Sequence, residues 1–379
     1  MKLRKGTPEE VGMSSQRLQD VAAVAERWVD TGEMPPIVML AARRGTIVFE
    51  KAIGPQTPDA DAPPLQLDTL FPLASITKVV TATCAMMLVE QGLLDVIQPV
   101  QKYLPEFTGT HKETVRVWHL LTHTSGLRDE DVYAHVERKR QEPSPLPECP
   151  ATQHPAIHER LTLSYDTALW KEPGKQMCYC NTGYELVGEI VRRVSERSLD
   201  AFARGSVFEP LGMKDTHLVV PQELWPRIVV YPDIPDGYAR MNDPKRRETP
   251  HAAGGLYSTV HDMAVFCQMY LNGGHYDGVR ILSPTTIRYM TKNHLPGVSA
   301  VKGDEFFPEA SWGIGWNIMG TKFDRGSLQS LQTYCHGGAG GVCIWIDPTY
   351  EVIGVYFSVG GTAQPSLYIN AINGAITEI

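Results

Sequence analysis

The chain has no long hydrophobic run, no excess of positive charge and few cysteines, and each shortage excludes a class of protein. Its 379 residues contain no uninterrupted apolar stretch of the roughly 20 residues that a membrane-spanning helix needs. The formal net charge is −8 and the sequence pI is near 5.9, which opposes binding to nucleic acid or to an anionic membrane surface. We therefore expect a small-molecule substrate, with no nucleic-acid partner and no membrane span.

The first residues and the cysteines carry no sign of export. The opening segment, MKLRKGTPEEVGM, is basic but lacks the apolar core of a secretory signal, so we expect a cytoplasmic protein. The seven cysteines are an odd number and fit free thiols in a reducing compartment. The spacings Cys178-x-Cys180 and Cys335-x7-Cys343 match no common zinc pattern, and no Gly-rich phosphate loop is present. We expect no metal and no cofactor.

The composition that remains is typical of a large globular protein with many turns. Apolar residues make up 42% of the chain, which also contains 33 glycines and 28 prolines. Because 379 residues exceed the common size of one domain, we expect either one large domain with an insertion or two packed lobes.

Both ends of the chain carry strand patterns. Apolar residues at helical intervals predict a first helix over residues 14–31, and residues 35–54 predict an antiparallel hairpin that turns at 43–45. More strands are expected over residues 311–319 and 340–359, followed by a closing helix over 363–379. These strands can form one sheet from the two ends of the chain.

The middle of the chain is rich in helix and loop signals. We expect a short helix over residues 115–126, an exposed rim or lid of a cleft over 128–160, and two helices after the start signals Asn181 and Thr182. This order predicts an α+β fold, in which an α/β lobe with an antiparallel sheet flanked by helices is interrupted by an all-helical lobe. The expected bounds are residues 1–91 and 251–379 for the sheet lobe and residues 92–250 for the helical lobe.

One apolar stretch, LASITKVV at residues 73–80, holds a serine three positions before a lysine. Residues at i and i+3 share a helix face, so the Lys78 amine can lie beside the Ser75 hydroxyl. The apolar sequence that follows predicts a long buried helix, which Ser75 caps and Gly92 ends. Main-chain N–H groups at such a helix start can hold an oxyanion. The pattern indicates a nucleophile with a base within reach.

The spacing by itself is common. Ser299 and Lys302 repeat it among Pro, Gly and charged residues, where no helical pattern is present. A serine hydrolase also needs a second proton-handling group and donors that face the oxyanion.

Two further segments can supply those groups. Tyr179-x-Asn181 places a tyrosine on a loop just before a predicted helix, whereas the same spacing at Tyr270 and Tyr368 falls inside predicted helices. His336-Gly337-Gly338 is the only H-x-G in the chain and precedes a predicted strand. Its glycines allow the main chain to approach a ligand closely.

The three motifs, in this order and at these separations, resemble the serine β-lactamase-like superfamily, which includes class C β-lactamases, DD-peptidases, D-aminopeptidases and family VIII carboxylesterases. The segments HLLTHTSGL, GGLYSTVHDMAVF and GIGW, at residues 119–127, 254–266 and 313–316, also resemble it, so the resemblance covers nearly the whole chain. It implies a β-lactamase/transpeptidase-like fold in which a helical lobe packs on an α/β lobe, with the serine at their junction.

The resemblance implies a role for each catalytic candidate. Ser75 would be the nucleophile, and Lys78 and Tyr179 would share the base and acid steps. Either of these two could be the base, since a desolvated lysine and a tyrosine phenolate are both possible. Asn181 would orient the substrate or the lysine.

The resemblance places the substrate site beside the glycine segment. His336, Gly337, Gly338 and Ala339 would line it, with the oxyanion held by the N–H groups of Ser75 and Ala339. His336 stands where the lactamases have the lysine of K-T-G. A neutral imidazole there removes a permanent cation, so we expect weaker selectivity for β-lactams.

The expected activity is hydrolysis through an acyl-enzyme. A carboxylesterase acting on short-chain esters is our first choice. The alternatives are an amidase of the D-aminopeptidase or DD-peptidase kind, a weak β-lactamase, or an acyltransferase that uses the same acyl-enzyme.

Other interpretations of the sequence compete with this one. His119 and His123 stand at i and i+4 and could hold zinc, but no Glu follows His119 as in H-E-x-x-H, and no third ligand is evident. Ser125 could be a second nucleophile, although a capping role at a helix end fits better. A binding or scaffolding protein on the same fold would have no need to keep Ser75 and Lys78 together.

Overall fold

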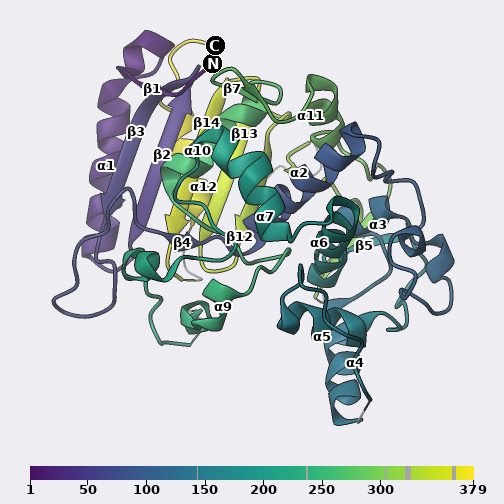
Figure 1. Ribbon diagram of the computed structural model, residues 1–379. Helices are drawn as coiled ribbons and strands as arrows, with labels where there is room; N and C mark the ends of the chain where they lie inside the picture. The colour runs from purple at the N-terminus through teal and green to yellow at the C-terminus, as the bar shows by residue number, and fades with distance from the viewer. Residues whose placement is uncertain (143, 236–237, 304, 321–325, 361–363) are drawn as a thin grey trace.

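The computed structural model describes residues 1–142, 144–235, 238–303, 305–320, 326–360 and 364–379. A seven-stranded sheet is built from both ends of the chain, in the order β1-β3-β2-β14-β13-β12-β11, and the two termini lie close together (Figure 1). Its strands pair antiparallel except for β1 and β3, which are parallel.

The strands are β1 (Arg4–Lys5), β2 (Ile37–Arg43), β3 (Thr46–Ile53), β4 (Phe71–Pro72), β5 (Gln176–Cys178), β6 (Tyr257–Ser258), β7 (His275–Tyr276), β8 (Val279–Arg280), β9 (Ser299–Lys302), β10 (Glu305–Phe307), β11 (Asn317–Ile318), β12 (Tyr334–Gly338), β13 (Val342–Asp347) and β14 (Val352–Ser358). The α-helices are α1 (Ser15–Asp30), α2 (Thr77–Glu90), α3 (Val117–Leu121), α4 (Asp129–Gln141), α5 (Pro155–Ser164), α6 (Asn181–Ser195), α7 (Leu199–Ala203), α8 (Glu209–Leu211), α9 (Lys245–Glu248), α10 (Val260–Leu271), α11 (Pro284–Met290) and α12 (Pro365–Asn373).

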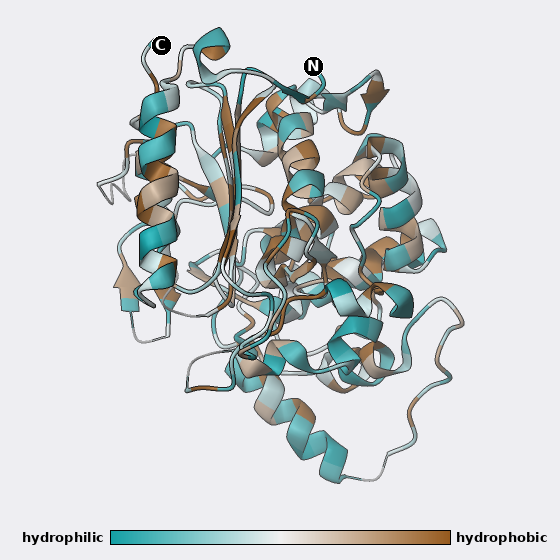
Figure 2. Ribbon diagram, turned by 90° about the vertical axis from the view of Figure 1, so that its left-hand side faces the viewer, coloured by the Kyte–Doolittle hydropathy of each residue, from teal (hydrophilic) through white to brown (hydrophobic). Residues whose placement is uncertain are grey.

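Helices cover both faces of the sheet. On β2, Ile37 and Met39 pack in a cluster with α1 and α12, whereas Val38 and Leu40 belong to the larger core that holds α2 and α10. Figure 2 shows the sheet edge-on with helices on either side. This double covering explains why β2 and β14 are buried along their whole length instead of alternating between apolar and polar residues.

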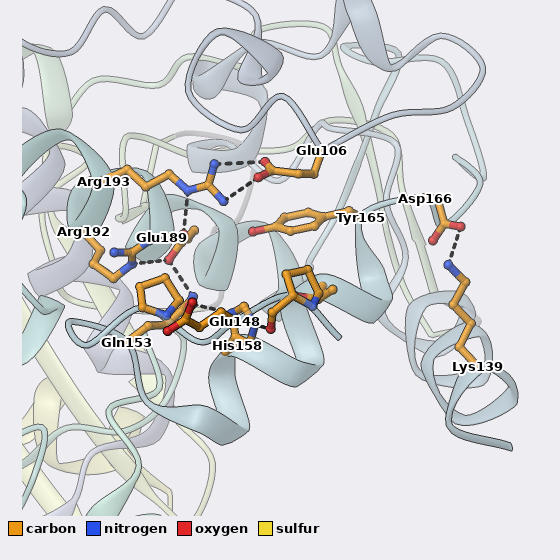
Figure 3. Close-up of a pocket in the computed structure, with 13 residues that line it drawn as sticks. Glu106, Lys139, Glu148, Gln153, His158, Tyr165, Asp166, Glu189, Arg192 and Arg193 are labelled. Carbon is orange, nitrogen blue, oxygen red and sulfur yellow. Dashed lines mark hydrogen bonds and ion pairs between the residues drawn. The ribbon is translucent and has the colours of Figure 1, made fainter. Parts of the chain in front are cut away.

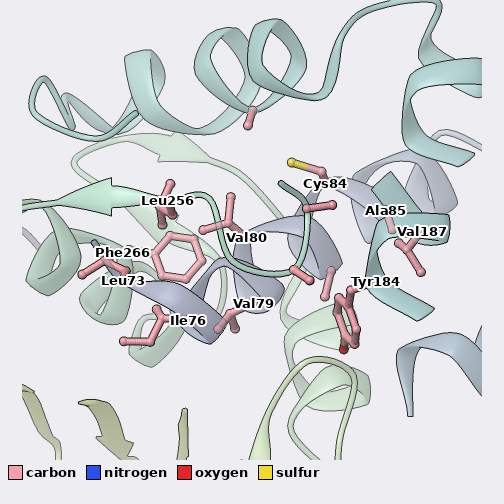
Figure 4. Close-up of a cluster of buried hydrophobic side chains, with 14 of the residues drawn as sticks. Leu73, Ile76, Val79, Val80, Cys84, Ala85, Tyr184, Val187, Leu256 and Phe266 are labelled. Atoms are coloured by element: carbon pink, nitrogen blue, oxygen red, sulfur yellow. The ribbon is translucent and has the colours of Figure 1, made fainter. Parts of the chain in front are cut away.

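Helix α2 runs through the centre of the molecule, where it packs against α6 and α7. It is buried around nearly its whole circumference, as a helix that is apolar on all sides must be. Figure 4 shows Val80 and Cys84 of α2 among Tyr184 and Val187 of α6 and Phe266 of α10. The start of α2 is therefore held rigidly between the sheet and the helices of the middle segment.

The elements predicted for the two ends of the chain are confirmed. The first helix is α1, whose N-cap Ser14 accepts from the main-chain N–H of Arg17, and the hairpin is formed by β2 and β3. The closing helix is α12, although residue 363 of its predicted segment lies outside the described residues. Helix α2 ends at Glu90, just before Gly92 with its φ of 72°.

One predicted helix has the wrong bounds, and two other segments contain elements that the sequence did not predict. The helix expected over 115–126 ends at Leu121, because His123 turns into the left-handed region with φ of 59°. The expected exposed excursion over 128–160 has only Val132, Val136 and Ile157 buried among its described residues, which exclude residue 143, and it contains α4 and the start of α5. Acidic residues in the first turn of α4 and basic residues in its last turn match the helix dipole. Its role as the rim or lid of a cleft stays a prediction. His336-Gly337-Gly338 precedes a strand, β13, as predicted, but it also lies within a strand of its own, β12, which the sequence did not predict.

Two further findings concern the helices and the cysteines. No helix in the described part of the chain combines the length and apolar character that crossing a membrane requires. No disulfide joins any of the seven cysteines, all of which lie in the described ranges. The cytoplasmic location stays a prediction, and so do the bounds of the two lobes.

Candidate active site

Ser75 lies in a short 3-10 turn (Ala74–Ile76) directly before α2. The main chain is strained here, because Ala74 adopts φ of 44°, a left-handed conformation that costs a non-glycine residue free energy. The Thr77 hydroxyl donates to the Ala74 carbonyl at 2.6 Å and stabilises this turn. The capping role predicted for Ser75 is wrong: α2 begins at Thr77, and no side-chain cap is present at its start.

The Ser75 hydroxyl instead faces Lys78. The lysine Nζ is within hydrogen-bonding distance of three oxygen atoms: the Ser75 Oγ at 3.1 Å, the Asn181 Oδ1 at 2.7 Å and the Ala253 carbonyl at 2.8 Å. The last two oxygens can only accept hydrogen bonds. A neutral amine that donates its two hydrogens to them therefore turns its lone pair toward the serine hydroxyl.

The surroundings of Lys78 make the neutral amine accessible. The side chain is fully buried, and this desolvation lowers the pKa of Lys78 to about 7, although the charges of Asp129 and Glu185 act to raise it. A group with this pKa exchanges a proton near neutral pH. Lys78 thus has the properties of a general base.

Asp129, at the start of α4, holds the asparagine that faces the lysine. Its carboxylate accepts from the main-chain N–H groups of Asn181 and Thr182 at 2.7 and 3.0 Å, and from the Asn181 Nδ2 at 2.8 Å. Because the Asn181 amide nitrogen is bound in this way, its Oδ1 must point to Lys78. Asp129, which sequence reasoning missed, also supplies the carboxylate that caps α6.

The Tyr179 side chain lies beside both Ser75 and Lys78. Burial raises the pKa of Tyr179 well above its ordinary value, and a hydrogen bond with the Ser75 side chain opposes this rise without cancelling it. The phenol is therefore protonated. Its ring stacks on His123, with ring centroids 4.3 Å apart, and the Lys78 Nζ lies 4.8 Å from its centre. The His123 Nδ1 accepts from the Cys180 main-chain N–H at 3.1 Å, which fixes the stacked ring.

His336, on strand β12, lies next to Tyr179. Its Nδ1 donates to the Gly337 carbonyl at 2.7 Å, and burial lowers the pKa of His336 to about 3, so the imidazole is neutral, as predicted. Its ring centroid lies 6.4 Å from that of Tyr179.

Gly338 brings the end of β12 against the peptide just before the serine. A Cβ atom on Gly338 would lie 2.3 Å from the Leu73 carbonyl oxygen, so only glycine fits there. The structure therefore brings Ser75, Lys78, Tyr179 and Asn181 into direct contact and places His336 and Gly338 beside them. Gly337 and Ala339 are the chain neighbours of Gly338, at the same end of β12.

The competing motifs lie elsewhere. Ser299 is on β9, where its Oγ accepts from the Gln176 Nε2, and Tyr270 is on α10, where its hydroxyl bonds to Thr83. His123 lies beyond the end of α3, so the helical i, i+4 pair with His119 does not exist. No group of three metal-ligating side chains occurs among the described residues.

Comparison with known proteins gives a consistent assignment. The family model described as Beta-lactamase matches residues 21–375. A putative D-alanyl-D-alanine carboxypeptidase of Salmonella schwarzengrund is 27% identical over 383 residues, which cover 91% of this chain and 83% of the relative.

Solved structures show the same architecture. The chain is similar to EstCE1, a hydrolase with promiscuous acyltransferase activity (TM-score 0.76, 21% identity, 96% of this chain and 99% of that one). It is also similar to a penicillin-binding protein homologue from Caulobacter crescentus (TM-score 0.76, 23% identity, 96% of this chain and 98% of that one). A family VIII carboxylesterase is similar as well (TM-score 0.74, 20% identity, 95% of this chain and 96% of that one). These likenesses confirm the predicted α+β, β-lactamase/transpeptidase-like fold.

Proposed function

Because the chain belongs to the beta-lactamase family and is a serine hydrolase, we propose that it cleaves short-chain carboxylic esters through an acyl-enzyme on Ser75. The observation that carries this proposal is the position of the Lys78 Nζ, 3.1 Å from the Ser75 Oγ and bound by two oxygens that cannot donate. A serine hydroxyl is a weak nucleophile until a base removes its proton as it attacks.

In the first step, neutral Lys78 takes the Ser75 proton as the Oγ attacks the ester carbonyl carbon. The pKa of Lys78 near 7 suits this transfer, whereas the raised pKa of Tyr179 opposes a resident phenolate. The sequence leaves both Lys78 and Tyr179 possible as the base, and these pKa shifts favour Lys78.

In the second step, the tetrahedral intermediate collapses and the alcohol leaves. We assign to Tyr179 the donation of a proton to the departing oxygen, after which the Lys78 ammonium restores the phenol. Water then attacks the acyl-enzyme with its proton taken by Lys78, and the Lys78 ammonium gives that proton to the Ser75 Oγ as the acid leaves. An alcohol in place of water would give acyl transfer by the same route.

The oxyanion needs main-chain donors, and we assign this role to the N–H groups of Ser75 and Ala339. The close contact between Gly338 and the Leu73 carbonyl supports it, since that contact brings the end of β12 to the peptide beside Ser75. His336, Gly337, Gly338 and Ala339 would line the acyl site.

The neutral His336 favours esters over β-lactams and D-alanyl peptides. Its pKa of about 3 leaves no charge at that position to pair with a substrate carboxylate. The naming of the Salmonella relative as a putative D-alanyl-D-alanine carboxypeptidase favours the second candidate, an amidase of the DD-peptidase kind.

A substrate panel separates the two functions. We would measure kcat/KM on p-nitrophenyl butyrate, on nitrocefin and on a D-alanyl p-nitroanilide. The proposal expects the ester to be turned over fastest. Faster turnover of the anilide would overturn the esterase assignment in favour of the amidase.

A further inference from the structure

We propose that Glu185 is a positioning residue for the base Lys78, and that it acts through the main chain of residues 252–253 without touching the lysine. The proposal rests on the proposed function only in taking Lys78 as the base of Ser75. It adds a second carboxylate, besides Asp129, that sets where the lysine amine lies and how readily it holds a proton.

Glu185 stands four residues after Asn181 on α6 and is 96% buried. Residues at i and i+4 share a helix face. The carboxylate accepts from the main-chain N–H groups of Ala252 and Ala253, at 3.2 and 3.3 Å, and lies 3.5 Å from the Nδ1 of His251. One face of α6 thus carries both a direct ligand of the lysine and a group that binds the loop beside it.

The loop that Glu185 binds is the one that faces helix α2. The Ala253 carbonyl accepts from the Lys78 Nζ at 2.8 Å, and the Ala252 carbonyl accepts from the Thr81 hydroxyl at 2.7 Å. The peptide unit between Ala252 and Ala253 is therefore bound by the carboxylate through its N–H and by Thr81 of α2 through its carbonyl. The Ala253 carbonyl that binds Lys78 belongs to the next peptide unit along the chain. Loss of the carboxylate frees the N–H side and lets the Ala253 carbonyl turn away from the lysine.

The packing leaves the loop little freedom while the carboxylate is in place. A Cβ atom on Gly188 would lie 2.4 Å from the Ala252 Cβ, so α6 approaches the loop as closely as glycine allows. Glu185 is one turn before this contact. The carboxylate and the glycine together set the distance between α6 and the peptide that binds Lys78.

The charge of Glu185 acts on the lysine as well. Burial raises the pKa of Glu185, but the hydrogen bond and charge of His251, the charge of Arg160 and the Ala253 N–H lower it further, so the side chain is an anion. The charged and titratable groups that act on Lys78 are Asp129, Glu185 and Cys180, which raise its pKa against burial. The imidazoles of His123 and His336, also close by, are held neutral.

Glu189, one turn further along α6, offers a matched control. It is equally buried, but its carboxylate pairs with Arg192 and Arg193 and accepts from Gln153, as Figure 3 shows. Among the described residues, its hydrogen bonds and ion pairs are with Gln153, Arg192 and Arg193, and not with the 252–253 loop or Lys78. A change of Glu189 to Gln thus removes a buried charge from the same helix without touching the peptide beside the base.

The test measures how fast an aryl phosphonate labels Ser75, by intact mass, from pH 5 to pH 9 in the wild type, Glu185→Gln, Glu185→Asp and Glu189→Gln. We expect Glu185→Gln to lower the plateau rate by about tenfold to a hundredfold, the scale of a misplaced catalytic group. We also expect the midpoint of the rise in labelling rate with pH to move to lower pH in Glu185→Gln. The reason is that the Glu185 anion and the bound Ala253 carbonyl, which both favour the Lys78 ammonium, are lost. Glu185→Asp, which keeps the charge, should hold the midpoint near that of the wild type.

Each outcome has a separate meaning. Unlabelled Ser75 in the wild type would contradict the proposed function itself. A wild type that is labelled, with Glu185→Gln matching Glu189→Gln in both rate and midpoint, would overturn the positioning role alone. If Glu185→Gln does not fold, the comparison of Glu185→Asp with Glu189→Gln decides: a lowered plateau rate in the aspartate variant alone supports the role, and equal rates overturn it.

Discussion

The S-x-x-K spacing occurs twice in this chain and produces two different structures. At Ser75 and Lys78 the main chain is helical, so the side chains lie on one face with Oγ and Nζ 3.1 Å apart. At Ser299 and Lys302 the same spacing lies on β9, where residues three apart point to opposite faces of the strand. The comparison shows that the spacing has chemical meaning only on a helix.

The two lysines also differ in their exposure to solvent. Lys78 has no exposed surface and is bound by two acceptor oxygens, whereas Lys302 is exposed at the end of a strand. Desolvation disfavours the charged amine, and this is what brings the pKa of Lys78 to about 7. Burial in the surrounding core, and not the S-x-x-K spacing, lowers the pKa of Lys78 so that its amine can be neutral near pH 7.

The largest effect is expected from replacing Ser75, with the same replacement at Ser299 as its control. Ser75→Ala removes the only atom that can carry the acyl group, so turnover of p-nitrophenyl butyrate should fall by a factor on the order of 10⁴ or more. Ser299→Ala removes only a hydrogen-bond acceptor of Gln176 and should leave kcat/KM unchanged. Normal turnover by Ser75→Ala would refute the assignment of the nucleophile.

The tyrosine comparison should give the next largest effect. Tyr179→Phe keeps the ring that stacks on His123 but removes the proton donor, and we expect kcat to fall by about 10²- to 10⁴-fold. Tyr368→Phe, in another Y-x-N spacing, removes a buried hydroxyl that has no hydrogen-bond partner in the described residues and serves as the control. Equal rates for the two variants would exclude Tyr179 from the chemistry.

A smaller effect is expected from the residue that holds Asn181. Asp129→Asn supplies an amide that cannot accept all the N–H groups now bound there, and it removes a charge that raises the pKa of Lys78. We expect kcat/KM to fall by about tenfold to a hundredfold, with the acidic limb of its pH profile moved to lower pH.

The matched control for this variant is Asp131→Asn on the same helix. The Asp131 carboxylate pairs with Arg128 and is partly exposed. If Asp129→Asn and Asp131→Asn gave the same kcat/KM and the same acidic limb, Asp129 would be a helix cap and nothing more.

The spacing at the start of a predicted helix was sufficient to predict the contact between Ser75 and Lys78. The placement of Tyr179 and Asn181 beside them was predicted from the resemblance to the β-lactamase-like superfamily, since their spacing alone occurs at other places in the chain. The sequence did not point to Asp129, which sits among other acidic residues in RDED and forms part of no periodic pattern. Nor did it point to Glu185, since a glutamate on an amphipathic helix ordinarily faces solvent.

Main-chain geometry was the other part that sequence reasoning missed. Nothing in the sequence marks Ala74 as a residue with φ of 44°, because alanine has no preference for that conformation. Strand β12 was missed because the glycines of CHGGAGG are depleted in strands, while here they let the strand approach Leu73. Both features depend on contacts with segments far away in the sequence.

The most direct test of the account is the pH dependence of Ser75 acylation by a slowly hydrolysed ester, followed by intact mass and peptide mapping. Lys78 must be neutral to accept the serine proton, and its pKa in the folded protein is about 7, so acylation should be slow at pH 5 and rise through about pH 7 to a plateau. The adduct should map to the peptide that contains Ser75. A rate that does not change across this range, or an adduct on another residue, would contradict the central claim that a buried lysine activates this serine.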